Sequence, residues 1–112
     1  LLTAPYTSGN QKRPKVAMDA VGDFVVTWQS FGQVLAGYYD IYAQRYSSSG
    51  AALGSEFLVN PVTLNTQLGS TGGSFVDESV AMDATGDFVV GWQEYGKNTT
   101  GTYYFGIGAQ RY

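Results

Sequence analysis

Apolar residues in this chain of 112 residues fall into short runs separated by glycine-rich and polar segments. The runs are rich in Val, Phe, Tyr and Trp, and the segments between them hold Gly, Ser, Asn and Asp, a pattern typical of β-strands joined by turns. The pattern therefore predicts an all-β protein. The predicted strands are Lys15–Asp19, Asp23–Gln29, Asp40–Tyr46, Glu56–Asn60, Ser79–Asp83, Asp87–Gln93 and Tyr104–Tyr112.

The predicted strands belong to two copies of one unit. Val16–Gly32 and Val80–Gly96 are identical at thirteen of seventeen positions, with an offset of 64 residues. The tetrapeptide AQRY then recurs at 43–46 and 109–112 with an offset of 66, so the copies differ by a two-residue insertion. Such repeats indicate units that bury their apolar faces by stacking. We divide the chain into residues 1–14, a first repeat at 15–60, a linker at 61–77 and a second repeat at 78–112.

The second repeat has no equivalent of the fourth predicted strand, Glu56–Asn60. Residues 1–3 precede the first repeat much as this strand precedes the second repeat, so we expect residues 1–14 to hold an exchanged strand. It would pair with Tyr104–Tyr112, which would otherwise be an open sheet edge. The residues expected at this assembly contact are Leu1, Leu2, Thr3, Gly106, Ile107, Ala109 and Arg111.

Four antiparallel strands per repeat, one of them taken from the other terminus, are typical of a β-propeller with strand-exchanged closure. The near-continuous apolar run Phe24–Trp28 fits a propeller-like blade that has a neighbour on each face. Two blades do not close a ring, so we expect self-association into a ring or a filament. The alternative is a single β-sandwich of seven or eight strands.

Composition excludes several kinds of chemistry. The chain has no Cys and no His, which removes disulfides, thiolates, imidazole bases and the usual zinc ligands. The net charge is −3 without a basic patch, so we expect no nucleic-acid partner. No apolar run reaches the ~20 residues of a membrane-spanning helix, and we expect no membrane insertion. A glycosidase needs two carboxylates converging on a cleft, but most carboxylates here lie at predicted turns and strand ends. We expect no enzyme and no cofactor.

The sequence D-A-x-G-D occurs at both predicted hairpin turns, 19–23 and 83–87. Its glycine supplies the positive φ of a tight turn, and its aspartates can hydrogen-bond the turn backbone. The same carboxylates are the candidates for Ca²⁺: Asp19, Asp23, Asp83 and Asp87. Because Val21 and Thr85 hold the central positions, each turn offers fewer oxygens than the roughly six to eight that Ca²⁺ prefers. We expect the aspartates to cap the turns and no metal to bind.

Two residue types recur at equivalent strand positions and have competing interpretations. Trp28 and Trp92 could stack on sugars, but their mid-strand position among Phe and Val favours the core. Arg45 and Arg111 recur at one strand position, and Arg45 could bind an anion or a glycan. We favour a structural role in which Arg45 forms an ion pair with a neighbouring carboxylate. The candidate partners of Arg45 are Asp19, Asp23 and Glu56.

The loops Ser30–Tyr39 and Glu94–Tyr103 differ most between the copies. Variable loops on a repeat scaffold commonly carry binding sites. Sequence drift, or burial in a subunit contact, explains the variation equally well. The candidate ligand-binding residues are Phe31, Tyr38, Tyr39, Tyr95, Asn98 and Tyr103.

The string VAMDxxGDFVVxWQ, followed by AQRY and EFLVN, resembles a tandem repeat of very large exported bacterial surface proteins of the adhesin type. Those proteins often also carry cadherin-like, Calx-β-like or haemolysin-type calcium-binding modules. The resemblance covers Val16–Asn60 and Val80–Tyr112. It implies an extracellular or cell-surface location in a bacterium and a structural or adhesive role. The family turn commonly reads D-x-D-G-D, and this chain departs from it at Val21 and Thr85.

Two functional hypotheses follow. The first is a non-catalytic extracellular structural or adhesive protein whose repeats assemble head-to-tail by strand exchange. The second is a small two-blade lectin that binds glycans as an oligomeric propeller, by analogy of architecture alone. Polymers in electron micrographs would favour the first hypothesis, and saturable binding of sugars at the aromatic loops would favour the second.

Overall fold

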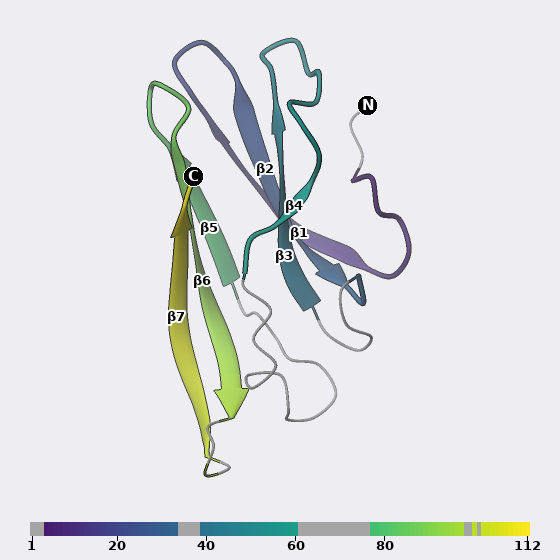
Figure 1. Ribbon diagram of the computed structural model, residues 1–112, viewed down its shortest axis with the longest axis vertical. Coiled ribbons are helices and arrows are strands. Elements are labelled where there is room, and N and C mark those ends of the chain that lie inside the picture. Colours follow the sequence, from purple (N-terminus) through teal and green to yellow (C-terminus); the bar gives the residue numbers. More distant parts are fainter. Residues whose placement is uncertain (1–3, 34–38, 61–76, 98–99, 101) are drawn as a thin grey trace.

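The computed structural model describes residues 4–33, 39–60, 77–97, 100 and 102–112, and these residues form two antiparallel sheets (Figure 1). Sheet A has the strand order β1-β2-β3-β4 and comes from the first repeat. Sheet B has the order β5-β6-β7 and comes from the second repeat. The strands are β1 (Gln11–Met18), β2 (Phe24–Phe31), β3 (Tyr39–Tyr46), β4 (Phe57–Leu58), β5 (Asp77–Met82), β6 (Phe88–Lys97) and β7 (Tyr103–Arg111).

The predicted all-β class is confirmed, with four strands in one sheet and three in the other. The described residues form no closed barrel or propeller. Leu1, Leu2 and Thr3 lie outside the described residues, so their pairing stays a prediction. Within the described part of the chain, β7 has one neighbouring strand, β6.

The strands differ from the predicted ones mainly in length. β1 begins four residues early, at Gln11, because its pairing with β2 continues through a bulge between Lys12 and Lys15. Pro14 lies in this bulge, where a residue without an N–H interrupts the ladder. β6 extends to Lys97, which pairs with Tyr103. β4 is shorter than predicted.

The two hairpins β1–β2 and β5–β6 have the same turn. Gly22 and Gly86 adopt φ values of 92° and 93°, in the left-handed region that glycine tolerates without a steric cost. The register that follows is also the same. Val26 pairs with Gln44 in sheet A, and the equivalent Val90 pairs with Gln110 in sheet B. The two repeats therefore give equivalent sheets up to their third strands.

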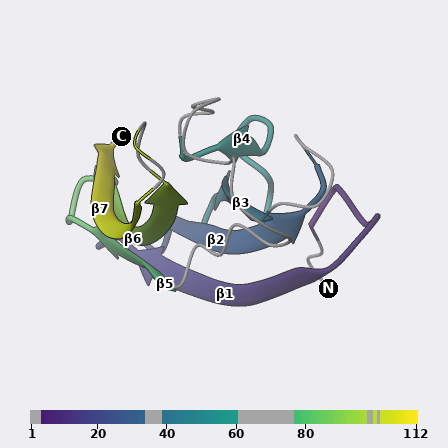
Figure 2. The same cartoon turned by 90° about the horizontal axis from the view of Figure 1, so that it is seen from below.

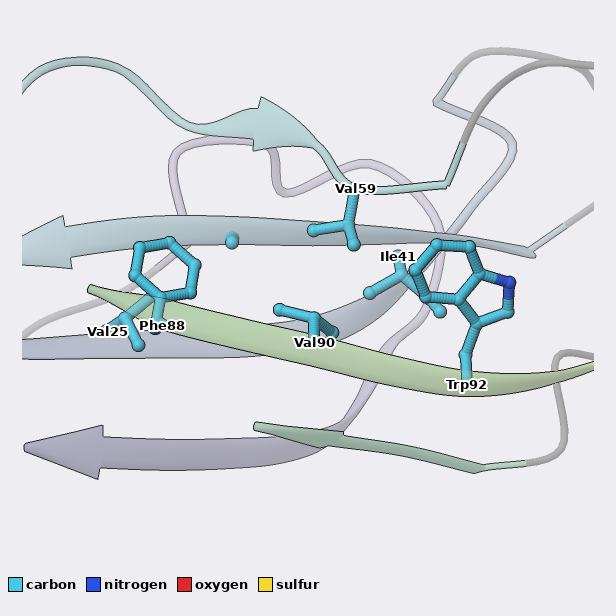
Figure 3. Close-up of a cluster of buried hydrophobic side chains, with 7 residues drawn as sticks. Val25, Ile41, Val59, Phe88, Val90 and Trp92 are labelled. Carbon is cyan, nitrogen blue, oxygen red and sulfur yellow. The ribbon is translucent and has the colours of Figure 1, made fainter. Parts of the chain in front are cut away.

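Sheet B packs against one face of sheet A, with β5 beside β1 (Figure 2). Side chains alternate between the two faces of a strand, so each sheet contributes every second residue to the contact. Figure 3 shows the core between the sheets, where side chains of β6 point toward β2, β3 and the end of β4. The buried members of this core are Val25, Ile41, Ala43, Val59, Phe88, Val90 and Trp92.

Candidate functional site

The contact between the sheets joins two different faces of one repeated unit. Sheet A contributes the face that carries Val25, Ile41 and Ala43, which we call the receiving face. Sheet B contributes the other face of the repeated unit, the reverse side of the one that sheet A contributes. Alternate residues of β6 form it, and we call it the inserting face. The inserting residues are Phe88, Val90 and Trp92 (Figure 3). Because the sheets are equivalent, each sheet has one receiving and one inserting face.

Polar groups also cross this contact. The Gln29 side chain donates to Glu78 Oε2 at 2.8 Å, and both residues are buried. The Arg45 guanidinium donates to the Gly86 carbonyl at 3.4 Å and lies 5.7 Å from the centre of the Phe88 ring. Such a cation above an aromatic face is attracted by the ring quadrupole. The expected ion pair of Arg45 with Asp19, Asp23 or Glu56 is therefore replaced by contacts to sheet B.

The fourth strand of sheet A extends the same contact. Phe57 in β4 packs against Phe88 and Tyr112 of sheet B, with ring centres 6.4 and 4.9 Å apart. The Tyr112 hydroxyl donates to the carbonyl of Val59 at 3.5 Å. A fourth strand thus contributes to the receiving face as well as to its own sheet.

The receiving face of sheet B is exposed. Ile107 and Val89 are 83% and 43% exposed, whereas the equivalent Ile41 and Val25 of sheet A are fully buried. Ala109 is exposed as well. Single exposed apolar residues are common on protein surfaces, but a contiguous apolar face indicates an interaction site. We identify this face as the candidate functional site.

Arg111 lies on this exposed face and differs from its equivalent, Arg45. Its guanidinium forms a salt bridge with Asp87 at 3.2 Å, and both side chains are exposed. Ile107, Ala109 and Arg111 were predicted as assembly residues, and the structure places them together on the receiving face of sheet B. Gly106 lies in the same strand, opposite Glu94.

The inserting face of sheet A is covered only in part, because Val16 and Met18 are exposed whereas Trp28, Tyr42 and Tyr46 are buried. Phe24 stacks on Tyr46, with ring centres 5.1 Å apart, and Trp28 stacks on Tyr42. A hollow of about 230 Å³ lies over this face, lined by Ala4, Gln11, Lys12, Pro14, Val26, Trp28 and Tyr46. Trp28 is buried, and its Nε1 has no hydrogen-bond partner among the described residues.

The two tryptophans are both buried, but on different faces of the molecule. Trp92 belongs to the core between the sheets and lies directly over Gly108. Trp28 lies on the far side of sheet A, beside the hollow. Trp92 therefore lies in the core, as predicted, whereas Trp28 is buried but also lines the hollow on the far face of sheet A.

The aspartates of both turns cap the backbone, as the sequence predicts. Asp19 Oδ1 accepts the N–H groups of Val21 and Asp23 at 2.9 and 3.0 Å. Asp83 Oδ1 accepts those of Thr85 and Asp87, at 2.9 and 3.1 Å. It also accepts the Thr85 hydroxyl at 2.8 Å. The hydroxyl, followed by the backbone groups, lowers the pKa of Asp83. No group of three or more carboxylates lies close enough to hold a metal ion in the described ranges.

The predicted ligand-binding residues are only partly described. Phe31 packs on Tyr39, with ring centres 4.9 Å apart, and the Lys12 ammonium lies 3.7 Å from the centre of the Tyr39 ring. These rings are held by their neighbours at the end of sheet A. Tyr95 and Tyr103 take part in the β6–β7 ladder through their backbones. Tyr38, Asn98 and the side chains of Tyr95 and Tyr103 lie outside the described residues.

Sequence reasoning missed a buried polar cluster at the start of β3. Asp40 Oδ1 accepts the Asn60 side-chain N–H at 3.0 Å, and Asn60 Oδ1 accepts the N–H of Ile41 at 2.7 Å. Burial raises the pKa of Asp40, and the bond from Asn60 opposes this rise. Asn60, which ends the predicted strand just before Pro61, was the available signal, because such a residue can replace a missing ladder bond.

No family model, curated protein or solved structure matches the chain. The described residues contain no helix that is long and apolar enough to cross a membrane.

Proposed function

We propose that this chain is a non-catalytic structural or adhesive repeat protein that acts by associating with further copies of its own repeat. One observation carries the proposal. Equivalent apolar residues are buried by a neighbouring sheet in the first repeat and exposed in the second, as with Ile41 and Ile107. The apolar face of the first repeat is covered by a sheet within the chain. The equivalent face of the second repeat has similar side chains and is therefore suited to bind a similar sheet.

The contacts of the carboxylates support a structural role for them. Each acidic side chain that forms a hydrogen bond or salt bridge in the described residues is used in a turn, a cross-strand bond or a contact between sheets. The pairs are Asp19 with Val21 and Asp23, Asp23 with Ser48, Asp40 with Asn60, Glu56 with Gln33, Glu78 with Gln29, Asp83 with Thr85, and Asp87 with Arg111. Groups held in this way are poorly placed to move protons for a substrate.

The resemblance to exported bacterial repeats supports an extracellular or cell-surface location. We propose that the chain works outside the cell or on its surface, where a repeat that associates with itself can build a ring, a filament or an adhesive layer. Propeller-like blades joined by an exchanged strand from residues 1–3 are the form of assembly that we favour.

The test is the size of the protein in solution. Sedimentation velocity and light scattering over a concentration series should show growth from monomers to larger species, and electron micrographs should show rings or filaments. A chain that stays monomeric at millimolar concentration would contradict the proposed function.

The hollow beside Trp28 favours glycan binding as a second candidate function. The hollow is lined by Trp28, Tyr46 and Lys12, so a bound sugar would contact aromatic rings and one ammonium donor. Titration of monosaccharides while following tryptophan fluorescence tests this function. A saturable change that is lost in Trp28→Phe would support a lectin, and no change at any sugar concentration would exclude it.

A further inference from the structure

We propose that the receiving face of sheet B binds the inserting face of sheet A in a second copy of this chain, in the register of the contact within the chain. This inference rests on the proposed function and names its partner surface. The occupant is therefore a second copy, which presents Val16, Met18 and the half-buried Val26 to the exposed face around Val89 and Ile107.

The first support is the equivalence of the two sheets. Val25 pairs with Arg45 and Ala17 in sheet A. The equivalent Val89 pairs with Arg111 and Ala81 in sheet B. The exposed face therefore presents the same kinds of side chain in the same register as the face that is already occupied. A surface of this shape and chemistry binds the inserting face of sheet B within the chain.

The inserting face of sheet A is open along β1, whereas Trp28, Tyr42 and Tyr46 on the same face are already buried within the chain. Val16 and Met18 in β1 are 63% and 60% exposed. Their equivalents in β5, Val80 and Met82, pack against the core between the sheets. The hollow beside Val26 lies on this face, so side chains from a second copy have space to enter.

Arg111 gives the contact a specific polar group. Within the chain, Arg45 reaches the Gly86 carbonyl and the Phe88 ring. On association, Arg111 leaves the exposed Asp87 carboxylate and takes the equivalent partners, the Gly22 carbonyl and the Phe24 ring of the second copy. An exposed salt bridge contributes little stability, so its loss does not oppose the exchange strongly.

The resulting contact joins two different faces, so each added copy leaves one face of each kind open. Such a head-to-tail contact closes into a ring if the rotation suits and otherwise continues as a filament. A dimer of two receiving faces, related by a two-fold axis, is the competing arrangement.

Single cysteines distinguish these arrangements, because the chain has none of its own. We would prepare Ala81→Cys and Val16→Cys separately, since both residues are exposed, and treat each alone and the mixture with a short bis-maleimide. The double variant Ala17→Cys/Val80→Cys is the matched control for the contact within the chain. It should form an internal cross-link in monomers.

The expected result is a cross-linked dimer in the mixture and not in either variant alone. Arg111→Ala should weaken the association of the otherwise unchanged chain about tenfold. Dimers from Ala81→Cys alone would overturn the inference in favour of paired receiving faces. An absence of cross-links in a mixture that sediments as oligomers would overturn it too, and in both cases the proposed function would stand. Failure of the unchanged chain to associate would contradict the proposed function itself.

Discussion

Ile41 and Ile107 occupy the same position in two copies of one sequence unit, yet one is fully buried and the other is 83% exposed. The strands around them pair in the same register. The difference comes from the next sheet, which covers the face around Ile41 in the first repeat. Burial in a repeat protein therefore depends on the neighbour of a unit as well as on its sequence.

The two arginines extend this comparison to polar groups. Arg45 lies against the covering sheet and contacts the Gly86 carbonyl, whereas Arg111 pairs with Asp87 of its own sheet. The same side chain therefore serves as an interface contact in one repeat and as a surface ion pair in the other. The Arg111 salt bridge thus lies on a face that no sheet of the described residues covers.

The largest expected difference concerns the two isoleucines. Ile41→Ala should lower the free energy of unfolding by about 2–5 kcal/mol, because it leaves a cavity in the core between the sheets. Ile107→Ala should change it by less than about 0.5 kcal/mol in dilute monomer, because the side chain is exposed. Urea unfolding followed by tryptophan fluorescence measures both values. Equal losses for the two variants would show that the second face is also covered in the monomer.

The glutamines Gln29 and Gln93 provide a smaller difference. Gln29→Ala removes a donor from the buried Glu78 carboxylate and should cost about 1–3 kcal/mol. Gln93→Ala, at the equivalent and half-buried position of sheet B, should cost less than about 0.5 kcal/mol. The same unfolding measurement applies. A larger cost at Gln93 would reverse the assignment of the covered and uncovered faces.

Much of this fold follows from local sequence. Short apolar runs predict the strands, and the D-A-x-G-D turns predict both hairpins, because glycine and the capping aspartate fix the chain direction locally. The repeat also predicts the equal register of the two sheets. These features depend on residues close together in the sequence.

The candidate site could not be predicted from the sequence, because it depends on how the two sheets stack and neither repeat alone determines this. Nothing near Val25 or Val89 indicates which of them a second sheet covers, since the two segments are nearly identical. The predicted partner of Arg45 was wrong for the same reason. Its observed partner, Gly86, is distant in the sequence and approaches Arg45 only when the sheets stack. A bulge such as the one at Pro14 is also not predicted by a pattern of apolar runs.

The third prediction concerns Asp40, which is buried in the first repeat and is replaced by Gly106 at the equivalent position of the second. Burial holds the folded-state pKa of Asp40 above the ordinary value of 3.8. Its ionised form therefore opposes folding, and its contribution to stability is present below pH 3.8 and lost as the pH rises through the folded pKa. Asp40→Asn keeps an acceptor for Asn60 without the charge, and should be more stable than the unchanged chain at pH 7. Comparing urea midpoints at pH 7 and pH 4 checks this, and a less stable variant at pH 7 would contradict it.

The smallest expected effect compares the two turns, which differ at Val21 and Thr85. The Thr85 hydroxyl is the first cause of the lowered pKa of Asp83. A lowered folded pKa contributes stability above pH 3.8, which is lost as the pH falls through the folded pKa. Thr85→Val makes the second turn resemble the first, so the pKa of Asp83 should move up toward its ordinary value, and the variant should lose stability at a higher pH on acidification. Thr85→Ser keeps the hydroxyl and should leave the pKa low. NMR titration of the Asp83 carboxyl carbon measures it directly, and an equal pKa in Thr85→Val and the unchanged chain would show that the backbone N–H groups alone set its value.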